Sequence, residues 1–226
     1  MNMNSKKKLI TLITSIALIA AIGVGATLAY LTATTGTVTN TFTVGSYAES
    51  ALDIFEHKAT LDKDSGSYVA ATGAAEVKEN TYANVLPGTT LDKDPTMRLV
   101  KDSPSSFLVI KATGLRTLPA TVTDDMNTSA WKDITASVGD TNTANTYYIY
   151  CPAKDGAVNY ITATDLANGD VTTAPLFNKL TVAPSFDGTS SINDLTFQGC
   201  AVQYSSAMGS DYVAAVVAAL PTGFVG

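Results

Sequence analysis

Histidine, cysteine and charged residues are all scarce in this sequence. Its 226 residues include one histidine, His57, and two cysteines, and only 15% are charged. A zinc site with two histidine ligands is therefore excluded, and the sequence has neither an HExxH motif nor the GxSxG turn that presents a nucleophilic serine. We predict no catalytic residue and no cofactor, and expect His57 to face solvent on a strand.

Basic residues are also few. The chain has 14 lysines and arginines against 20 aspartates and glutamates, a formal net charge of −6. Beyond the lysines at positions 6–8, no cluster or stripe of positive charge occurs. Because phosphate binding depends on such clusters, we do not expect nucleic acid as a partner.

The first 29 residues have the layout of a secretory signal peptide. Three lysines precede an uncharged run, and small residues stand where signal peptidase acts, with Ala29 directly before the cut and Thr27 two positions before it. The alternative is a permanent anchor, since residues 9–31 carry no charge and are numerous enough to span a bilayer. We expect cleavage between Ala29 and Tyr30, so that the chain contacts the membrane only before this step.

Cleavage divides the chain into three predicted parts. Residues 1–29 are the signal peptide, residues 30–45 an N-terminal strand segment, and residues 46–226 a single domain. The processed chain keeps 11 basic and 20 acidic residues, a formal net charge of −9. This charge favours solubility outside the cell.

Short strand-like segments, separated by turn dipeptides such as PG, DG and NG, dominate the sequence after Ala29. Their β-branched and aromatic content and their spacing predict an all-β fold, an antiparallel β-sandwich of the jelly-roll type with long loops. The segments are residues 37–44, 51–57, 96–100, 106–112, 146–151, 158–163, 176–182 and 195–204. Two long loops are expected at residues 63–80 and 123–145.

One helix is predicted near the C-terminus, in SDYVAAVVAALP. Ser210 is the expected N-cap, and Pro221 ends the helix. Val213, Val216, Val217 and Leu220 have the spacing of one helical face, which we expect to pack on the sheet.

Cys151 and Cys200 both fall in predicted strands. In an oxidising exterior they could form a disulfide, which would stabilise the fold by roughly 4 kcal/mol in the chain-entropy model. Two buried free thiols are the alternative, because spacing alone does not show whether the two Cα atoms are close enough.

The tetrapeptide LDKD occurs twice, at residues 61–64 and 91–94. In the first copy Asp62 and Asp64 precede a glycine, which is a weak candidate for calcium binding because the other ligands of a calcium loop are missing. The alternative for both copies is a polar hairpin turn.

Four stretches, in this order, resemble the TasA/camelysin family of secreted biofilm-matrix proteins. GVGATLAYLT followed by NTFTVG is similar to the signal cleaved by SipW-type peptidases of Gram-positive bacteria. VLPGTTLDKDPTMRLV at residues 85–100 is similar to an element that follows in this family, and TAPLFNKLTV and GCAVQY with the helical VAAVVAAL are similar to its second half. The resemblance spans nearly the whole chain.

This resemblance implies a jelly-roll subunit that polymerises head-to-tail into fibres in the extracellular matrix or on the surface of a Gram-positive bacterium. The segment freed by cleavage inserts as a strand into the next subunit. Alternation then places Val38, Phe42 and Val44 in pockets of the recipient, and the threonines face away. Implied partners are the chain itself, a signal peptidase and an accessory matrix protein.

Two other functions stay open from the sequence. Family membership could bring a metallo-endopeptidase activity, against which the single histidine and the missing HExxH motif argue. A monomeric surface adhesin or accessory fibre protein is the third possibility.

Overall fold

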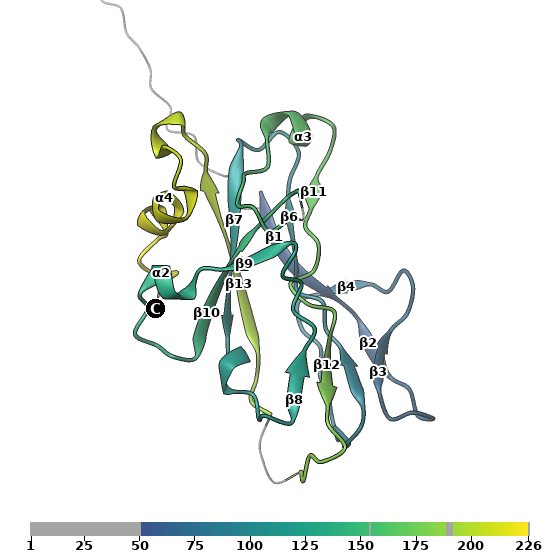
Figure 1. The fold of residues 1–226 in the computed structure, drawn as a ribbon. Helices are drawn as coiled ribbons and strands as arrows, with labels where there is room; N and C mark the ends of the chain where they lie inside the picture. The colour runs from purple at the N-terminus through teal and green to yellow at the C-terminus, as the bar shows by residue number, and fades with distance from the viewer. Residues whose placement is uncertain (1–50, 154, 189–191, 226) are drawn as a thin grey trace, which may run out of the picture. The chain divides into compact units, whose positions relative to one another are not determined.

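The computed structural model describes residues 51–153, 155–188 and 192–225 (Figure 1). The predicted cleavage site at Ala29 and Tyr30 and the predicted donor residues Val38, Phe42 and Val44 lie outside these ranges. The described strands are β1 (Leu52–His57), β2 (Ala59–Leu61), β3 (Tyr68–Ala70), β4 (Glu76–Val77), β5 (Thr90–Asp92), β6 (Thr96–Leu99), β7 (Ser106–Thr113), β8 (Val122–Asp124), β9 (Trp131–Asp133), β10 (Asn145–Tyr150), β11 (Val171–Thr172), β12 (Lys179–Val182) and β13 (Thr196–Gln203). The described helices are η1 (Leu115–Thr117), α2 (Thr135–Val138), α3 (Ala163–Ala167), η2 (Ser206–Met208) and α4 (Tyr212–Ala219).

The strands form a β-sandwich. One sheet has the order β13-β7-β10-β9, and two further sheets have the orders β11-β6-β1-β4 and β2-β3-β5-β12-β8. The pairs are antiparallel except for a parallel contact of β3 with β5 at Tyr68 and Leu91. The predicted all-β sandwich with a short C-terminal helix is confirmed.

The other two sheets continue into each other at the junction of β5 and β6. The backbone N–H of Lys93 donates to the Asn178 carbonyl at 2.9 Å, and the Leu176 N–H donates to the Pro95 carbonyl at 2.9 Å. These bonds continue the ladder on either side of the bend at Pro95, so that both sheets face the same side of the main sheet.

β10 shows why the main sheet is so apolar. All six of its residues are buried. Tyr148 and Tyr150 pack in the core between the sheets, whereas Tyr147 and Ile149 pack in a second cluster on the opposite face, beneath α4. A strand covered on both faces has no solvated side, which explains the continuous apolar run.

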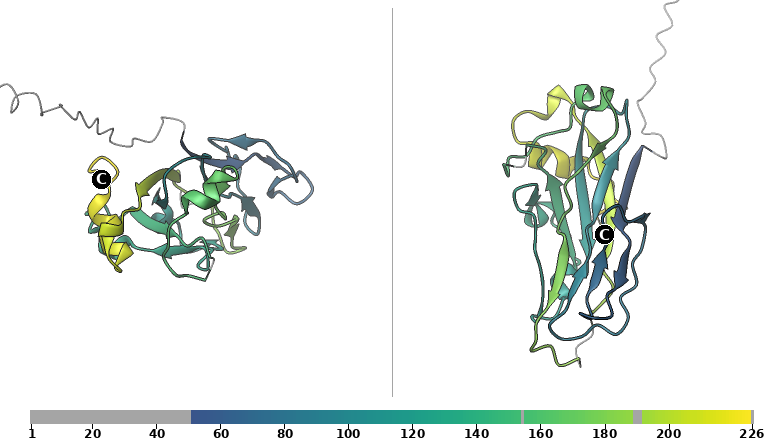
Figure 2. Two further views of the ribbon diagram at one scale, coloured as in Figure 1. Left: turned by 90° about the horizontal axis from the view of Figure 1, so that it is seen from above. Right: turned by 90° about the vertical axis from the view of Figure 1, so that its right-hand side faces the viewer.

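α4 forms where the sequence predicts a helix, but its N-cap is not the predicted residue. The Asp211 carboxylate, not Ser210, accepts a hydrogen bond from the Ala214 N–H at 3.0 Å. Val216 and Leu220 are buried against the main sheet, while Val213 and Val217 are half-buried. Figure 2 shows the C-terminal segment, in yellow, along one side of the sandwich. Among the described residues, the helices lack the length and apolar character needed to span a membrane.

Residues 158–163 differ from their predicted strand. Ile161 makes an isolated bridge with Ser106, and α3 begins at Ala163. Thr162 caps this helix, since its hydroxyl accepts from the Asp165 N–H and the Asp165 carboxylate accepts from the Thr162 N–H. This reciprocal capping box favours a helix start over a strand.

The two predicted long loops contain short elements. β3 and β4 lie within residues 63–80, and β9 and α2 lie within residues 123–145. Strands of two or three residues bury too few side chains to produce an alternating pattern, so no periodicity indicates them.

Cys151 and Cys200 are free thiols. Val109 of β7 pairs with Ile149 of β10 on one side and with Cys200 of β13 on the other, so β7 lies between the two cysteines. Two strand spacings are about 10 Å, which is more than a disulfide spans. Burial raises the pKa of both thiols, that of Cys200 to about 11.

Candidate functional site

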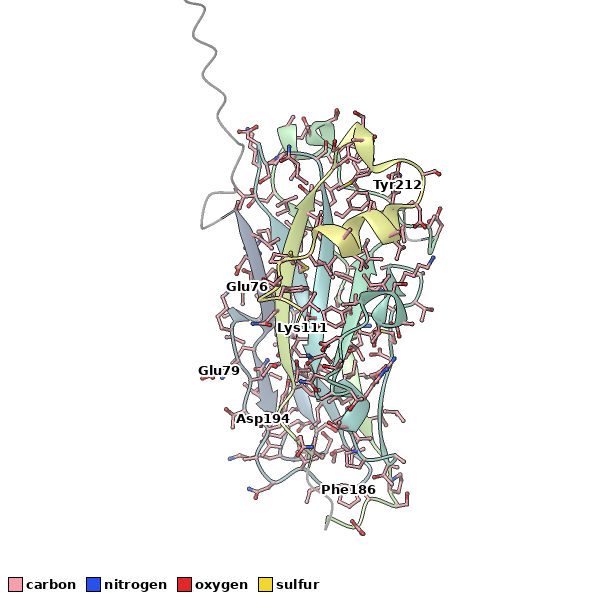
Figure 3. All side chains as sticks on the ribbon, turned by 90° about the vertical axis from the view of Figure 1, so that its left-hand side faces the viewer. Glu76, Glu79, Lys111, Phe186, Asp194 and Tyr212 are labelled. Atoms are coloured by element: carbon pink, nitrogen blue, oxygen red, sulfur yellow. The ribbon has the colours of Figure 1, made fainter. Side chains whose placement is uncertain are left out.

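Two strand edges lie side by side on one flank of the molecule. Among the described residues, β13 is the edge strand of the main sheet, and β1 is covered by β4 only at Glu56 and His57. β1 and β13 are neighbours without pairing to each other (Figure 3). The N–H and C=O groups of an uncovered edge can accept a further strand.

A groove of about 620 Å³ separates these edges over part of their length. β1 and residues 78–85 contribute one wall, residues 192–197 contribute the other, and Leu91 and Leu180 lie at its floor. Its apolar wall residues are half-buried: Ile54, Tyr82, Val85, Ile192, Leu195 and Phe197. The groove thus offers a row of apolar side chains beside two strand edges.

Gly199 determines where the groove ends along β13. A Cβ atom at this position would lie 2.7 Å from Met97 Cε and 3.7 Å from Leu52 Cδ2. The absence of a side chain therefore allows β13 to approach the β1–β6 layer closely at this point. The groove lies beyond this point, beside Phe197 and Ile54.

Side chains form hydrogen bonds with the backbone N–H and C=O groups of β1 that point into the groove. The Ile54 N–H donates to Asp53 Oδ1 at 2.9 Å, and Lys78 Nζ donates to the Ile54 carbonyl at 2.7 Å. Lys78 and Asp53 also form an ion pair with each other. These exposed side chains take the place that a neighbouring strand would occupy, which is a known way to protect an edge.

A buried ion pair forms part of the groove lining. Lys93 Nζ lies 2.7 Å from Glu56 Oε1, and the two side chains are 9% and 8% exposed. The Asn80 amide donates to Glu56 Oε2 at 3.2 Å. The Lys93 ammonium also lies 5.1 Å from the Phe197 ring centroid and 5.8 Å from that of Tyr82.

Tyr82 is held as a neutral hydrogen-bond donor beside this pair. Its hydroxyl donates to the Asp92 carbonyl at 2.6 Å. Burial, followed by the negative charges of Glu56 and Asp94, raises the pKa of Tyr82 well above its usual range. The phenol therefore does not ionise at physiological pH.

The second LDKD copy is not a hairpin turn. Leu91 and Asp92 belong to β5, Lys93 is buried in the ion pair, and Asp94 binds His57 through a 2.5 Å contact to Nδ1. Leu91 and Lys93 share a face because side chains alternate along a strand. Sequence reasoning missed Lys93 and Glu56; the strand-like LDKDPTMRL, with an acidic residue in LDIFEH, was the available signal.

The remaining predicted residues lie away from the groove. Asp62 belongs to the β2–β3 turn, where its carboxylate accepts from the Ser65 hydroxyl at 2.7 Å and the Asp64 N–H at 3.0 Å. These bonds lower the pKa of Asp62. Among the described residues, no three or more His, Cys, Asp or Glu side chains gather as a metal site. Asp62 therefore serves the turn.

His57 ends β1 and is partly accessible. Its side chain is 38% exposed, so it faces solvent in part, but its ring and its backbone N–H both bind the Asp94 carboxylate. This arrangement ties β1 to the bend between β5 and β6.

No protein-family model, no curated protein and no solved structure matches this chain.

Proposed function

We propose that this protein is a secreted structural subunit that polymerises head-to-tail into extracellular fibres. The N-terminal segment of residues 30–45, freed by cleavage after Ala29, inserts as a strand into the groove between β1 and β13 of the next subunit. The processed chain functions in the extracellular matrix or on the surface of a Gram-positive bacterium, as the resemblance to the TasA/camelysin family implies.

One observation carries this proposal: two strand edges flank an apolar groove on the same side of the sandwich. β13 has a free outer edge among the described residues, and the outward groups of Ile54 bind only side chains. A strand added in trans would satisfy the β13 edge, replace the side chains bound to Ile54 and cover the half-buried wall residues.

The proposed donor matches the groove in pattern and charge. Residues 37–44, TVTNTFTV, alternate, so that Val38, Phe42 and Val44 share one face. The segment of residues 30–45 contains no charged residue. An uncharged strand with three apolar residues on one face is suited to the apolar side chains of Ile54, Val85 and Phe197 in the groove.

Donor and acceptor are different surfaces of one chain. The contact is therefore heterologous and continues into a filament instead of closing as a dimer. Cleavage acts as the switch, because an N-terminus held in the membrane is not available to a neighbouring subunit.

Electron microscopy of negatively stained protein tests this proposal. We expect filaments from residues 30–226 and none from the same chain lacking residues 30–44. Ile54→Arg, which places a charge in the groove, should also abolish filaments, whereas Gln203→Arg on the exposed end of β13 should not. Filaments from the deletion variant would contradict the proposal.

A further inference from the structure

The apolar face of the proposed donor segment contains one polar residue. In TVTNTFTV the even positions are Val38, Asn40, Phe42 and Val44. Because the side-chain period of a strand is two, Asn40 shares the face that enters the groove. An amide in the centre of this face has to find hydrogen-bond partners once it is buried.

Among the described polar residues that line the groove, only Lys93 and Glu56 are buried. The Lys93 ammonium has three N–H groups, and among the described residues its one hydrogen-bond acceptor is Glu56 Oε1. Glu56 Oε2 accepts from Asn80 at 3.2 Å and has further lone pairs. The rings of Tyr82 and Phe197 also lie beside the Lys93 ammonium.

We propose that Asn40 of the donor segment binds the Lys93–Glu56 ion pair of the recipient subunit and thereby sets the register of strand insertion. The Asn40 carbonyl accepts from the Lys93 ammonium, and its amide donates to the Glu56 carboxylate. This proposal rests on the proposed function, since it requires residues 37–44 of a second copy to occupy the groove.

The register argument follows from the strand period. A slip of two residues keeps the same face toward the groove but places Val38 or Phe42 against the ion pair. The pair then loses its remaining water without gaining a partner, and Asn40 is buried among apolar side chains. One polar residue of the donor face that meets the buried ion pair therefore disfavours both slipped registers, as a buried asparagine does in coiled coils.

The test is a mutant cycle on filament elongation, measured from short wild-type seeds with processed chains of residues 30–226. We expect Asn40→Ala to slow elongation by about tenfold, in line with the loss of charge-assisted hydrogen bonds, and Thr39→Ala, on the opposite face, to slow it less than about twofold. When seeds and monomers both carry Lys93→Met and Glu56→Leu, adding Asn40→Ala to the monomers should slow elongation by less than about twofold, because no polar partner is left to lose.

The outcomes separate this inference from the proposed function. No elongation by wild-type protein means that the proposed function fails. Elongation with equal rates for Asn40→Ala and Thr39→Ala overturns the inference alone, and so does an undiminished Asn40→Ala effect on the double-variant seeds. If the double variant does not fold, the comparison of Asn40→Ala with Thr39→Ala on wild-type seeds still decides.

Discussion

At the scale of single residues, the Lys93–Glu56 pair is the most consequential polar contact of the groove. Both side chains are more than nine-tenths buried, and they join β1 to the end of β5. Taking two charges out of water costs free energy that only their mutual attraction and added hydrogen bonds offset. Such a pair fixes geometry more than it stabilises the fold.

Removing one partner of this ion pair should destabilise the folded protein. We expect Lys93→Met to lower the free energy of unfolding by about 3 kcal/mol, because Glu56 is then buried without its cation. Lys93→Met combined with Glu56→Leu should recover most of this loss. Urea denaturation measures both, with the exposed Lys63→Met as the control; a single variant as stable as the control would contradict this role.

Asp140 should contribute a pH dependence at acid pH. Hydrogen bonds from the Tyr147 hydroxyl at 2.6 Å and the Asn145 amide at 2.7 Å lower the pKa of its carboxylate from 3.8 to about 2. A pKa depressed in the folded state stabilises the protein above the ordinary value, and this contribution is lost as pH falls from about 4 through about 2.

The comparison of wild type with Asp140→Asn isolates this contribution. Between pH 5 and pH 2 the wild-type Tm should fall further than that of the variant, and the difference between the two proteins should shrink toward pH 2. Parallel Tm curves across this range would show that Asp140 contributes no pH dependence.

At the scale of elements, α4 covers one face of the main sheet and depends on its first turn. Asp211→Ala removes the acceptor of the Ala214 N–H and should cost about 1 kcal/mol. Ser210→Ala, at the position that the sequence pattern favours as the cap, should cost less than about 0.5 kcal/mol. Urea denaturation of both variants distinguishes the two caps, and the opposite order would contradict the structure.

Substitutions on the two faces of the proposed donor strand should have different effects on filament formation. Phe42→Asp should reduce the yield of sedimentable filaments by at least about tenfold, because it places a carboxylate in an apolar groove. Thr41→Asp, on the outward face, should reduce it by less than about threefold. Sedimentation and quantification of the pellet measures both, and equal losses would mean that the donor has a different register.

The sequence predicts elements that bury a regular face. β1, β6, β7, β10, β13 and α4 lie where β-branched and aromatic segments or helical spacing indicate them. The groove could not be predicted, because it depends on which strands become edges, and edge position is a property of sheet order. The role of Lys93 could not be predicted either. The tetrapeptide LDKD has the composition of a turn, and only the pairing of β5 with β12 shows that this part of the chain is a strand.

At the scale of the whole molecule, the described domain is covered on one side and open on another. α4 and the C-terminal residues bury the outer face of the main sheet, whereas the flank between β1 and β13 has uncovered edges among the described residues. A monomer with such a flank is exposed to strand addition, and a partner that supplies the strand removes this liability.

Mixing two complementary variants tests strand exchange most directly. One variant lacks residues 30–44 and keeps the groove; the other keeps the N-terminal segment and carries Ile54→Arg. Analytical ultracentrifugation should show monomers for each variant alone and a one-to-one complex for the mixture, because only one donor–acceptor contact is then possible. Absence of the complex in the mixture, while wild-type protein polymerises, would contradict insertion of the N-terminal segment between β1 and β13.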